Sequence, residues 1–291
     1  MNRRGFVYFG LTALSSPCAA AEDQASATSR QAEWAGTVAL NAARRDGGET
    51  GAAQLIALTR QTGRSTLRAT LSRYRGTVRQ LDNETRPTFA VATLGWGHRS
   101  STWFVDLYAS SGRQTYGTIT QAGVVRTSTG PSTSPYWAAG GSVGRVFRPT
   151  ERWYLTASGS LNYAYSRVLR PGPLGRRTDR DSSEPALGAS ATLRIDRQLD
   201  RHGAVMAGTF ASVRATTNAA SDFSVAGRGT GPSGGGLRFD QNRQGDHWVE
   251  GGLTLMLPVT RRVSAEGYVS RSFGERVGSA VNAGFSLRIG L

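Results

Sequence analysis

Residues 263–291 read VSAEGYVSRSFGERVGSAVNAGFSLRIGL, and small or apolar side chains occupy every second position in two parts of this stretch. In the first part they are Val263, Ala265, Gly267 and Val269, and in the second Val281, Ala283, Phe285, Leu287, Ile289 and Leu291. A period of two is typical of β-strands, because successive side chains point to opposite faces. Two strands of about ten residues, each apolar on one face, match the membrane-spanning strands of a closed barrel.

The same alternation recurs along the chain and is clearest at residues 153–165. Trp153, Tyr163 and Tyr165 lie at the two ends of its apolar face, where membrane interfaces select aromatic side chains. Short connections are expected near residues 62, 99, 149, 199 and 259, and longer ones near residues 47, 81, 123, 176, 230 and 275. This rhythm predicts an all-β fold, an antiparallel transmembrane β-barrel of about 12 strands with short periplasmic turns and long external loops.

Two regions, residues 51–75 and 112–135, fit this pattern least well. Leu67 and Leu71 are also spaced for a helix, so a helical hairpin over residues 52–80 is the alternative to two strands. For the whole chain the alternative is a secreted β-sandwich, which gives no reason for short and long connections to alternate.

The N-terminus has the pattern of an export signal. Arg3 and Arg4 precede a short apolar core, and Ala19–Ala21 supply small residues for cleavage. We therefore expect residues 1–21 to be a signal peptide, 22–33 a flexible periplasmic lead-in and 34–291 a barrel in the cell outer membrane. A twin-arginine signal and a lipoprotein signal at Cys18 are weaker alternatives, the latter because Pro17 stands where a small residue is needed.

The charge is strongly positive, and all 35 basic residues are arginine, which gives a formal net charge of +15. The arginines gather in expected loops and turns rather than along one helix face, so we expect no nucleic acid partner. Planar guanidinium groups in external loops suit the phosphates of lipopolysaccharide and outer-membrane lipid. A gene composition that favours arginine codons explains the same bias equally well.

The chain resembles the broad class of bacterial outer-membrane β-barrels over nearly all of its expected mature length. The most specific part is residues 282–291, NAGFSLRIGL, although members of the class usually end in Phe and this chain ends in Leu291. The resemblance implies that the barrel-assembly machinery reads the last strand through Phe285, Leu287, Ile289 and Leu291. The class includes oligosaccharide porins, autotransporter translocator domains and a phospholipase, so it does not fix an activity.

Residues that could carry catalysis are sparse. His98, His202 and His247 fall in or beside expected turns and loops, without the spacing of metal ligands. A hydrolase that uses His98 with Ser100 or Ser101 is the weakest alternative, because the flanking sequence lacks a nucleophile elbow. We therefore expect no enzymatic activity, no metal and no cofactor.

Six charged residues fall on the polar face of their strands and should line the lumen. They are Arg68, Asp106, Arg194, Glu250, Glu266 and Arg288. Enclosed charges must pair or contact water, and we expect Glu250 and Glu266 to face Arg288 across the next hairpin. The favoured function is a passive channel for small or anionic solutes, for example an anionic oligosaccharide. The alternative is a structural or surface-interaction barrel, translocator-like or adhesin-like, whose loops at 112–135, 166–185 and 215–245 bind a partner.

Overall fold

The computed structural model describes residues 34–46, 50–80, 83–172, 178–200, 205–218, 245–275 and 278–291, without the side chains of residues 78–80. The expected signal peptide and periplasmic lead-in lie outside the described residues. Within these ranges no helix is both long and apolar enough to cross a membrane.

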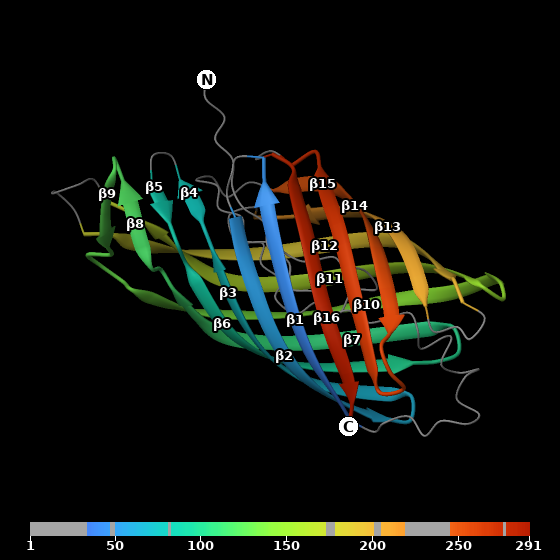
Figure 1. The fold of residues 1–291 in the computed structure, drawn as a ribbon. Helices are drawn as coiled ribbons and strands as arrows, with labels where there is room; N and C mark the ends of the chain where they lie inside the picture. The colour runs from blue at the N-terminus through green and yellow to red at the C-terminus, as the bar shows by residue number, and fades with distance from the viewer. Residues whose placement is uncertain are drawn as a thin grey trace.

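Twelve long strands form a closed antiparallel barrel (Figure 1). In chain order they are β1 (Trp34–Arg45), β2 (Thr50–Thr62), β3 (Ser65–Gly76), β6 (Thr88–Arg99), β7 (Trp103–Thr115), β10 (Thr133–Thr150), β11 (Trp153–Arg170), β12 (Arg180–Gln198), β13 (Met206–Thr216), β14 (Asp246–Pro258), β15 (Val263–Phe273) and β16 (Ala280–Gly290). Strand β16 pairs with β1 and closes the barrel, from Ala35 opposite Gly290 to Arg45 opposite Ala280. The predicted antiparallel barrel is confirmed, and residues 52–76 are strands rather than a helical hairpin.

Burial alternates along the strands because one set of side chains faces the barrel interior and the other faces outward. Along β11, Tyr154 and Ala164 are buried, whereas Trp153, Leu161 and Tyr163 are 40%, 57% and 36% exposed. Leu94, Leu253 and many other large apolar side chains are likewise exposed on the outer wall. An outer wall of this composition is unfavourable in water and favourable in hydrocarbon.

The two ends of the barrel differ in their connections. The short connections β2–β3, β6–β7, β10–β11, β12–β13 and β14–β15 gather at one end, which we name the turn end. Strand β1 starts there, and the Leu291 amide donates a hydrogen bond to the Trp34 carbonyl at 2.9 Å. The longer connections gather at the opposite end, the loop end. The predicted alternation of short and long connections is therefore confirmed.

A second, small sheet stands at the loop end (Figure 1). Its strands lie in the order β4 (Val78–Gln80), β5 (Asn83–Thr85), β8 (Thr118–Gln121) and β9 (Val124–Thr127). The connection from β3 to β6 contributes β4 and β5, and the connection from β7 to β10 contributes the hairpin β8–β9. The uncertain region 112–135 is thus the end of β7, this hairpin and the start of β10.

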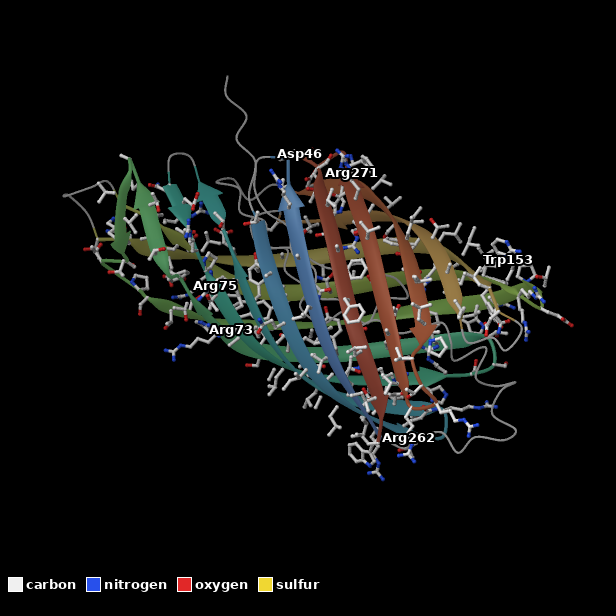
Figure 2. All side chains as sticks on the ribbon, in the orientation of Figure 1. Asp46, Arg73, Arg75, Trp153, Arg262 and Arg271 are labelled. Atoms are coloured by element: carbon white, nitrogen blue, oxygen red, sulfur yellow. The ribbon has the colours of Figure 1, made fainter. Side chains whose placement is uncertain are left out.

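Aromatic side chains mark both ends of the outer wall. At the turn end three arginines lie over the indole rings of adjacent strands, with guanidinium-to-ring distances of 5.3 to 5.5 Å. The pairs are Arg60 with Trp34, Arg145 with Trp103 and Arg197 with Trp153 (Figure 2 labels Trp153). At the loop end Trp137 packs against Tyr163 and Tyr165, with ring centroids 5.0 and 5.8 Å apart. Two such belts are typical of strands that cross a bilayer.

The last strand has the predicted facing. Phe285, Leu287 and Ile289 of β16 are exposed on the outer wall, and Leu291 follows directly after the strand. Their recognition by the barrel-assembly machinery stays a prediction.

Candidate functional site

The candidate site is the inner wall of the barrel, where the six predicted charged residues belong by alternation. Asp106, Arg194, Glu250 and Glu266 are buried there, with 3% to 7% of each residue exposed, and Arg68 is partly buried. Arg288 is exposed near the turn end, opposite Thr37 of β1 and Ser264 of β15.

Arg194 forms the best-defined ion pair of this wall. Its Nε donates to both carboxylate oxygens of Asp196 at 2.9 Å, and its Nη2 donates to the Thr254 hydroxyl at 3.1 Å. Both charged side chains are at most 5% exposed. The guanidinium therefore reaches from β12 past β13 to β14, and its charge is compensated inside the wall.

Gly208 makes this reach possible because it lies opposite both Asp196 and Thr254 in the sheet register. A Cβ atom at Gly208 would lie 2.1 Å from the Asp196 Oδ1 and 2.8 Å from the Thr254 Oγ1. A glycine in a strand interior costs free energy, so its presence here is explained by the close approach of these groups.

We expect Gly208→Ala to lower the free energy of unfolding by about 1 to 3 kcal/mol, because the added methyl group overpacks a filled site. Unfolding in urea, followed by tryptophan fluorescence of the refolded barrel, measures this change. Gly36→Ala is the matched control, since no atom lies within 4 Å of a Cβ built there. Equal stability of the two variants would contradict the packing argument.

Glu250 has a different partner from the one expected from the sequence. Its carboxylate lies 3.2 Å from the Nε of Arg214 on β13 and accepts a hydrogen bond from the Ser270 hydroxyl at 2.7 Å. Glu266 lies opposite Ser286 in the register, whereas Arg288 is two residues nearer the turn end. Arg214 therefore pairs with Glu250 on the inner face, as Arg194 pairs with Asp196.

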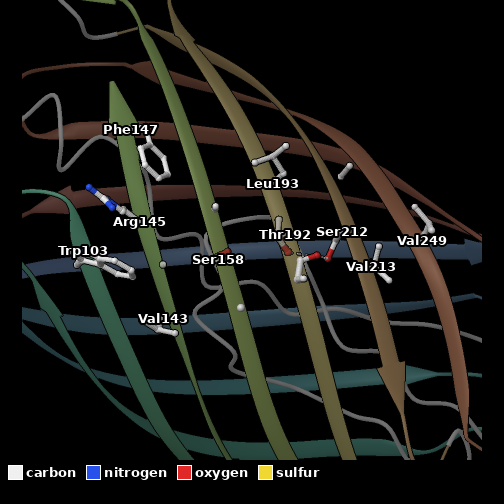
Figure 3. Close-up of a pocket in the computed structure, with 15 residues that line it drawn as sticks. Trp103, Val143, Arg145, Phe147, Ser158, Thr192, Leu193, Ser212, Val213 and Val249 are labelled. Atoms are coloured by element: carbon white, nitrogen blue, oxygen red, sulfur yellow. Dashed lines mark hydrogen bonds between the residues drawn. The ribbon is translucent and has the colours of Figure 1, made fainter. Parts of the chain in front are cut away.

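Hydroxyl groups connect neighbouring strands between these charged pairs. The Thr192 and Ser212 hydroxyls lie 2.8 Å apart, and both residues are drawn in Figure 3. Ser160 and Ser190 hydroxyls are 2.7 Å apart, one step nearer the loop end. Cross-strand hydroxyl pairs of this kind stabilise a sheet and give the inner wall neutral polar groups.

Apolar side chains gather on another part of the inner wall, near the loop end. We name this region the aromatic arc; it contains Leu55, Tyr74, Phe89, Val91 and Tyr136, with alanines from β1, β2, β10 and β11. Phe89 is fully buried, and its ring centroid lies 5.9 Å from that of Tyr74 and 6.0 Å from that of Tyr136. The aromatic arc thus lies on β1–β3, β6, β10 and β11, and the Arg194–Asp196 and Arg214–Glu250 pairs lie on β12–β14.

Asp179 ties two loop-end connections together. Its carboxylate accepts hydrogen bonds from the Arg126 guanidinium at 2.8 Å and from the backbone amides of Thr129 and Gly172 at 2.9 and 2.8 Å. The hydrogen bond from Arg126 holds the pKa of Asp179 well below its usual range, and the two amides act in the same direction. The hairpin β8–β9 is thereby fixed to the connection between β11 and β12.

We expect this tie to persist at pH 4, because a carboxyl with a depressed pKa contributes stability above its unfolded pKa and loses it only as the pH falls through the lower folded value. Hydrogen exchange, corrected for intrinsic rates, should show equal protection of the Thr129 and Gly172 amides at pH 7 and pH 4. Asp179→Asn should remove that protection at both values. Asp181→Asn is the control, since Asp181 accepts hydrogen bonds from the side chains of Tyr116 and Arg167. An equal loss of amide protection in both variants would contradict the role assigned to Asp179.

The residues of the hydrolase alternative are not assembled as that alternative requires. The Nδ1 of His98 lies 3.0 Å from the Ser65 hydroxyl, on the exposed side of the wall. Ser100 instead accepts a hydrogen bond from the Trp103 amide in the β6–β7 turn. Among the described residues, no cluster of three or more His, Cys, Asp or Glu side chains is placed to hold a metal.

Sequence reasoning missed several residues that the inner wall brings together. Asp196, Arg214 and the aromatic arc were not singled out, although the period of two already places Arg214 with Glu250 on the inward face. Arg45 and Glu275, whose side chains are fully buried and 2.8 Å apart, were also missed. Their pairing depends on the closure of β16 onto β1, which a local pattern does not encode.

Comparisons with known proteins support the fold. No protein-family model and no curated protein matches the sequence. The structure is similar to the translocator domain of the autotransporter NalP from Neisseria meningitidis, with a TM-score of 0.64, 15% identity, and coverage of 93% of this chain and 92% of that one. The β domain of the Bordetella autotransporter BrkA gives a TM-score of 0.58 at 13% identity, over 89% of this chain and 99% of that one. An outer-membrane channel from Pseudomonas putida F1 gives 0.54 at 11% identity, over 90% and 97%.

These similarities show that the chain has the fold of outer-membrane β-barrels. Because autotransporter domains and a channel share it, the fold is compatible with more than one function.

Proposed function

We propose that the protein is exported to the outer membrane and provides a passive pathway for small solutes, oligosaccharides included. The observation that carries the proposal is the inner wall, where partly buried hydroxyl pairs offer polar contacts and buried ion pairs stabilise the sheet, inside an apolar outer wall. The exposed apolar band and the two aromatic belts support a position across a bilayer. The start of β1 at Trp34 and the end of the last strand at Leu291 then lie on the periplasmic side, and the small sheet lies outside the cell.

The proposed pathway has little preference for anions. Arg194 is compensated by Asp196, and Arg214 lies against Glu250, so these two arginines do not form a one-sided cationic track. Selection then depends mainly on the width and polarity of the lumen. The hydroxyl pairs of the inner wall suit the hydroxyl groups of sugars, which is why we include oligosaccharides among the solutes.

The test begins with gel mobility of the full chain from a detergent-extracted outer-membrane fraction, unboiled against boiled. A folded barrel should run faster before heating. Planar bilayer recordings should then show discrete conductance with weak charge selectivity, and Arg194→Gln/Asp196→Asn, which removes both charges of the pair, should change that selectivity little. A folded barrel that conducts no ions in bilayers would overturn the proposal.

The second candidate is a surface-interaction barrel, and the tie at Asp179 favours it. This carboxylate holds the β8–β9 hairpin through Arg126, and Val124 and Val125 of the hairpin are 50% and 65% exposed at the loop end. Loop-dependent binding to a surface partner, lost in Val124→Ser/Val125→Ser while the heat-dependent mobility is kept, would support this function. Unchanged binding in that variant would count against it.

A further inference from the structure

The outer wall holds an apolar groove across β2, β3, β6 and β7, with a volume of about 600 Å³. It is lined on its outward side mainly by Ile56, Leu58, Leu71, Ala92, Leu94 and Ala109. The groove exists because alanines separate the exposed leucines: Ala92 lies opposite Leu71, and Ala109 lies opposite Leu94. Four adjacent strands span about 14 Å, which is wider than one extended acyl chain.

Three arginines stand at the loop-end border of this groove, on the same outward face. We name Arg73, Arg75 and Arg113 the arginine triad; all three are exposed. In the register Arg73 lies opposite Ala90, which lies opposite Arg113, and the next outward row toward the turn end contains Leu71 and Ala92 of the groove. The spacing between these rows is about 7 Å. Figure 2 shows Arg73 and Arg75 side by side on the outer wall.

The residues that flank Arg73 and Arg113 in the sheet are neutral, so they do not offset the positive charge of these arginines. Gln54 and Ala90 flank Arg73, and Ala90 and Pro135 flank Arg113 in the same row of outward residues. The Nη2 of Arg113 donates to the Thr133 hydroxyl of β10 at 3.0 Å, and this exposed contact has to be exchanged for the guanidinium to turn toward Ala90 on the other side of β7. Ala90 has a short side chain, so the two long arginine side chains can approach one anionic group above it. Guanidinium pairs bind phosphate through paired N–H groups.

A second groove on the same wall provides an internal comparison (Figure 3). It has about 690 Å³ and is lined by Val143, Leu193, Val213 and Val249. Its cation is Arg145, whose guanidinium lies 4.9 Å from the Phe147 ring and 5.5 Å from the Trp103 ring. The two grooves are similar in size and apolar character. The second groove, however, has one arginine, Arg145, which lies over aromatic rings at the turn end, whereas the first has the arginine triad at the loop end.

We infer that the β2–β7 groove and the arginine triad form a binding site for lipid A, with its phosphates on the arginines and its acyl chains in the groove. The inference rests on the proposed outer-membrane position, which places the loop end in the outer leaflet. Two features favour this occupant: several cations suit a lipid that carries more than one phosphate, and a groove across four strands suits a lipid with several chains.

The experiment is native mass spectrometry of the full chain in detergent, titrated separately with lipid A, monophosphoryl lipid A and phosphatidylglycerol. Lipid A should bind most tightly, and Arg73→Gln/Arg113→Gln should weaken it at least tenfold. Ala92→Phe, which fills the groove, should weaken all lipid A binding without affecting the arginines. The matched controls are Arg44→Gln/Arg271→Gln, two outward arginines of the same end, and Ala283→Phe on the outward face of β16.

Two outcomes would overturn the inference: unchanged lipid A affinity in Arg73→Gln/Arg113→Gln, or equal affinity for phosphatidylglycerol and lipid A. All variants are first checked for heat-dependent gel mobility, so that a loss of binding is read only from folded barrels. The assay does not depend on conductance. A barrel that conducts no ions but binds lipid A would therefore contradict the channel and support the lipid site. A barrel that conducts, but whose lipid A affinity does not depend on the arginine triad, would support the channel and reject the lipid site.

Discussion

Arg194→Met should lower the free energy of unfolding by about 3 to 5 kcal/mol, because it leaves the buried Asp196 carboxylate without its guanidinium. Asp196 has no measurable exposure, so water does not readily replace the lost partner. Urea unfolding of the refolded barrel, followed by tryptophan fluorescence, provides the measurement.

The double variant Arg194→Met/Asp196→Leu separates the charge from the packing. Removing both charges should restore most of the lost stability, since an apolar pair of similar volume is often neutral relative to a buried ion pair. Arg197→Met is the matched control, because Arg197 is exposed on the outer wall over Trp153, and a contact of that kind contributes about 0.5 to 1 kcal/mol. If the single variant is as stable as the double variant, Asp196 is compensated by other groups and the ion pair has no special role.

The fold was predictable because a barrel is encoded by a local pattern repeated in each strand. The period of two places Phe285 and Leu287 outward and Glu250 and Arg194 inward without any knowledge of the neighbouring strand. Even the weakly patterned residues 52–76 follow this rule: Ile56 and Leu58 face outward, and Leu55 faces inward.

Pairing across the wall was less predictable, since it depends on the stagger of strands. Arg194 and Thr254 are 60 residues apart in sequence, and they meet because Gly208 on the strand between them leaves room. Glu250 was expected to face Arg288, but the register of β13 with β14 brings Arg214 to it. The strands of the small sheet, such as β5, have three or four residues, which is too short for a period to be recognised.

The aromatic arc was missed for a different reason: alternation tells which way a side chain points but not what it packs against. Tyr74 and Tyr136 fall on inward positions that the pattern treats as the polar face. Their burial becomes visible only when β3, β6, β7 and β10 are placed in this order around the barrel, as in Figure 1.

Phe89→Ala should destabilise the barrel by about 3 to 5 kcal/mol, because it removes a fully buried ring from the centre of this arc and leaves a cavity. The unfolding midpoint in urea and the temperature at which the gel mobility changes should both fall. Phe273→Ala is the matched control: Phe273 is 50% exposed on the outer wall, and its removal leaves no enclosed cavity.

Comparing these two phenylalanines distinguishes a packed inner wall from a wetted one. If Phe89→Ala is as mild as Phe273→Ala, the aromatic arc contacts water or solute in the membrane-inserted protein, and its rings belong to the surface of the pathway. If the effect is large, the arc is a structural core on one side of the barrel. Solutes are then expected to follow the opposite side, along the ion pairs and hydroxyls of β12–β15, and variants of Arg214 rather than of Phe89 should change conductance.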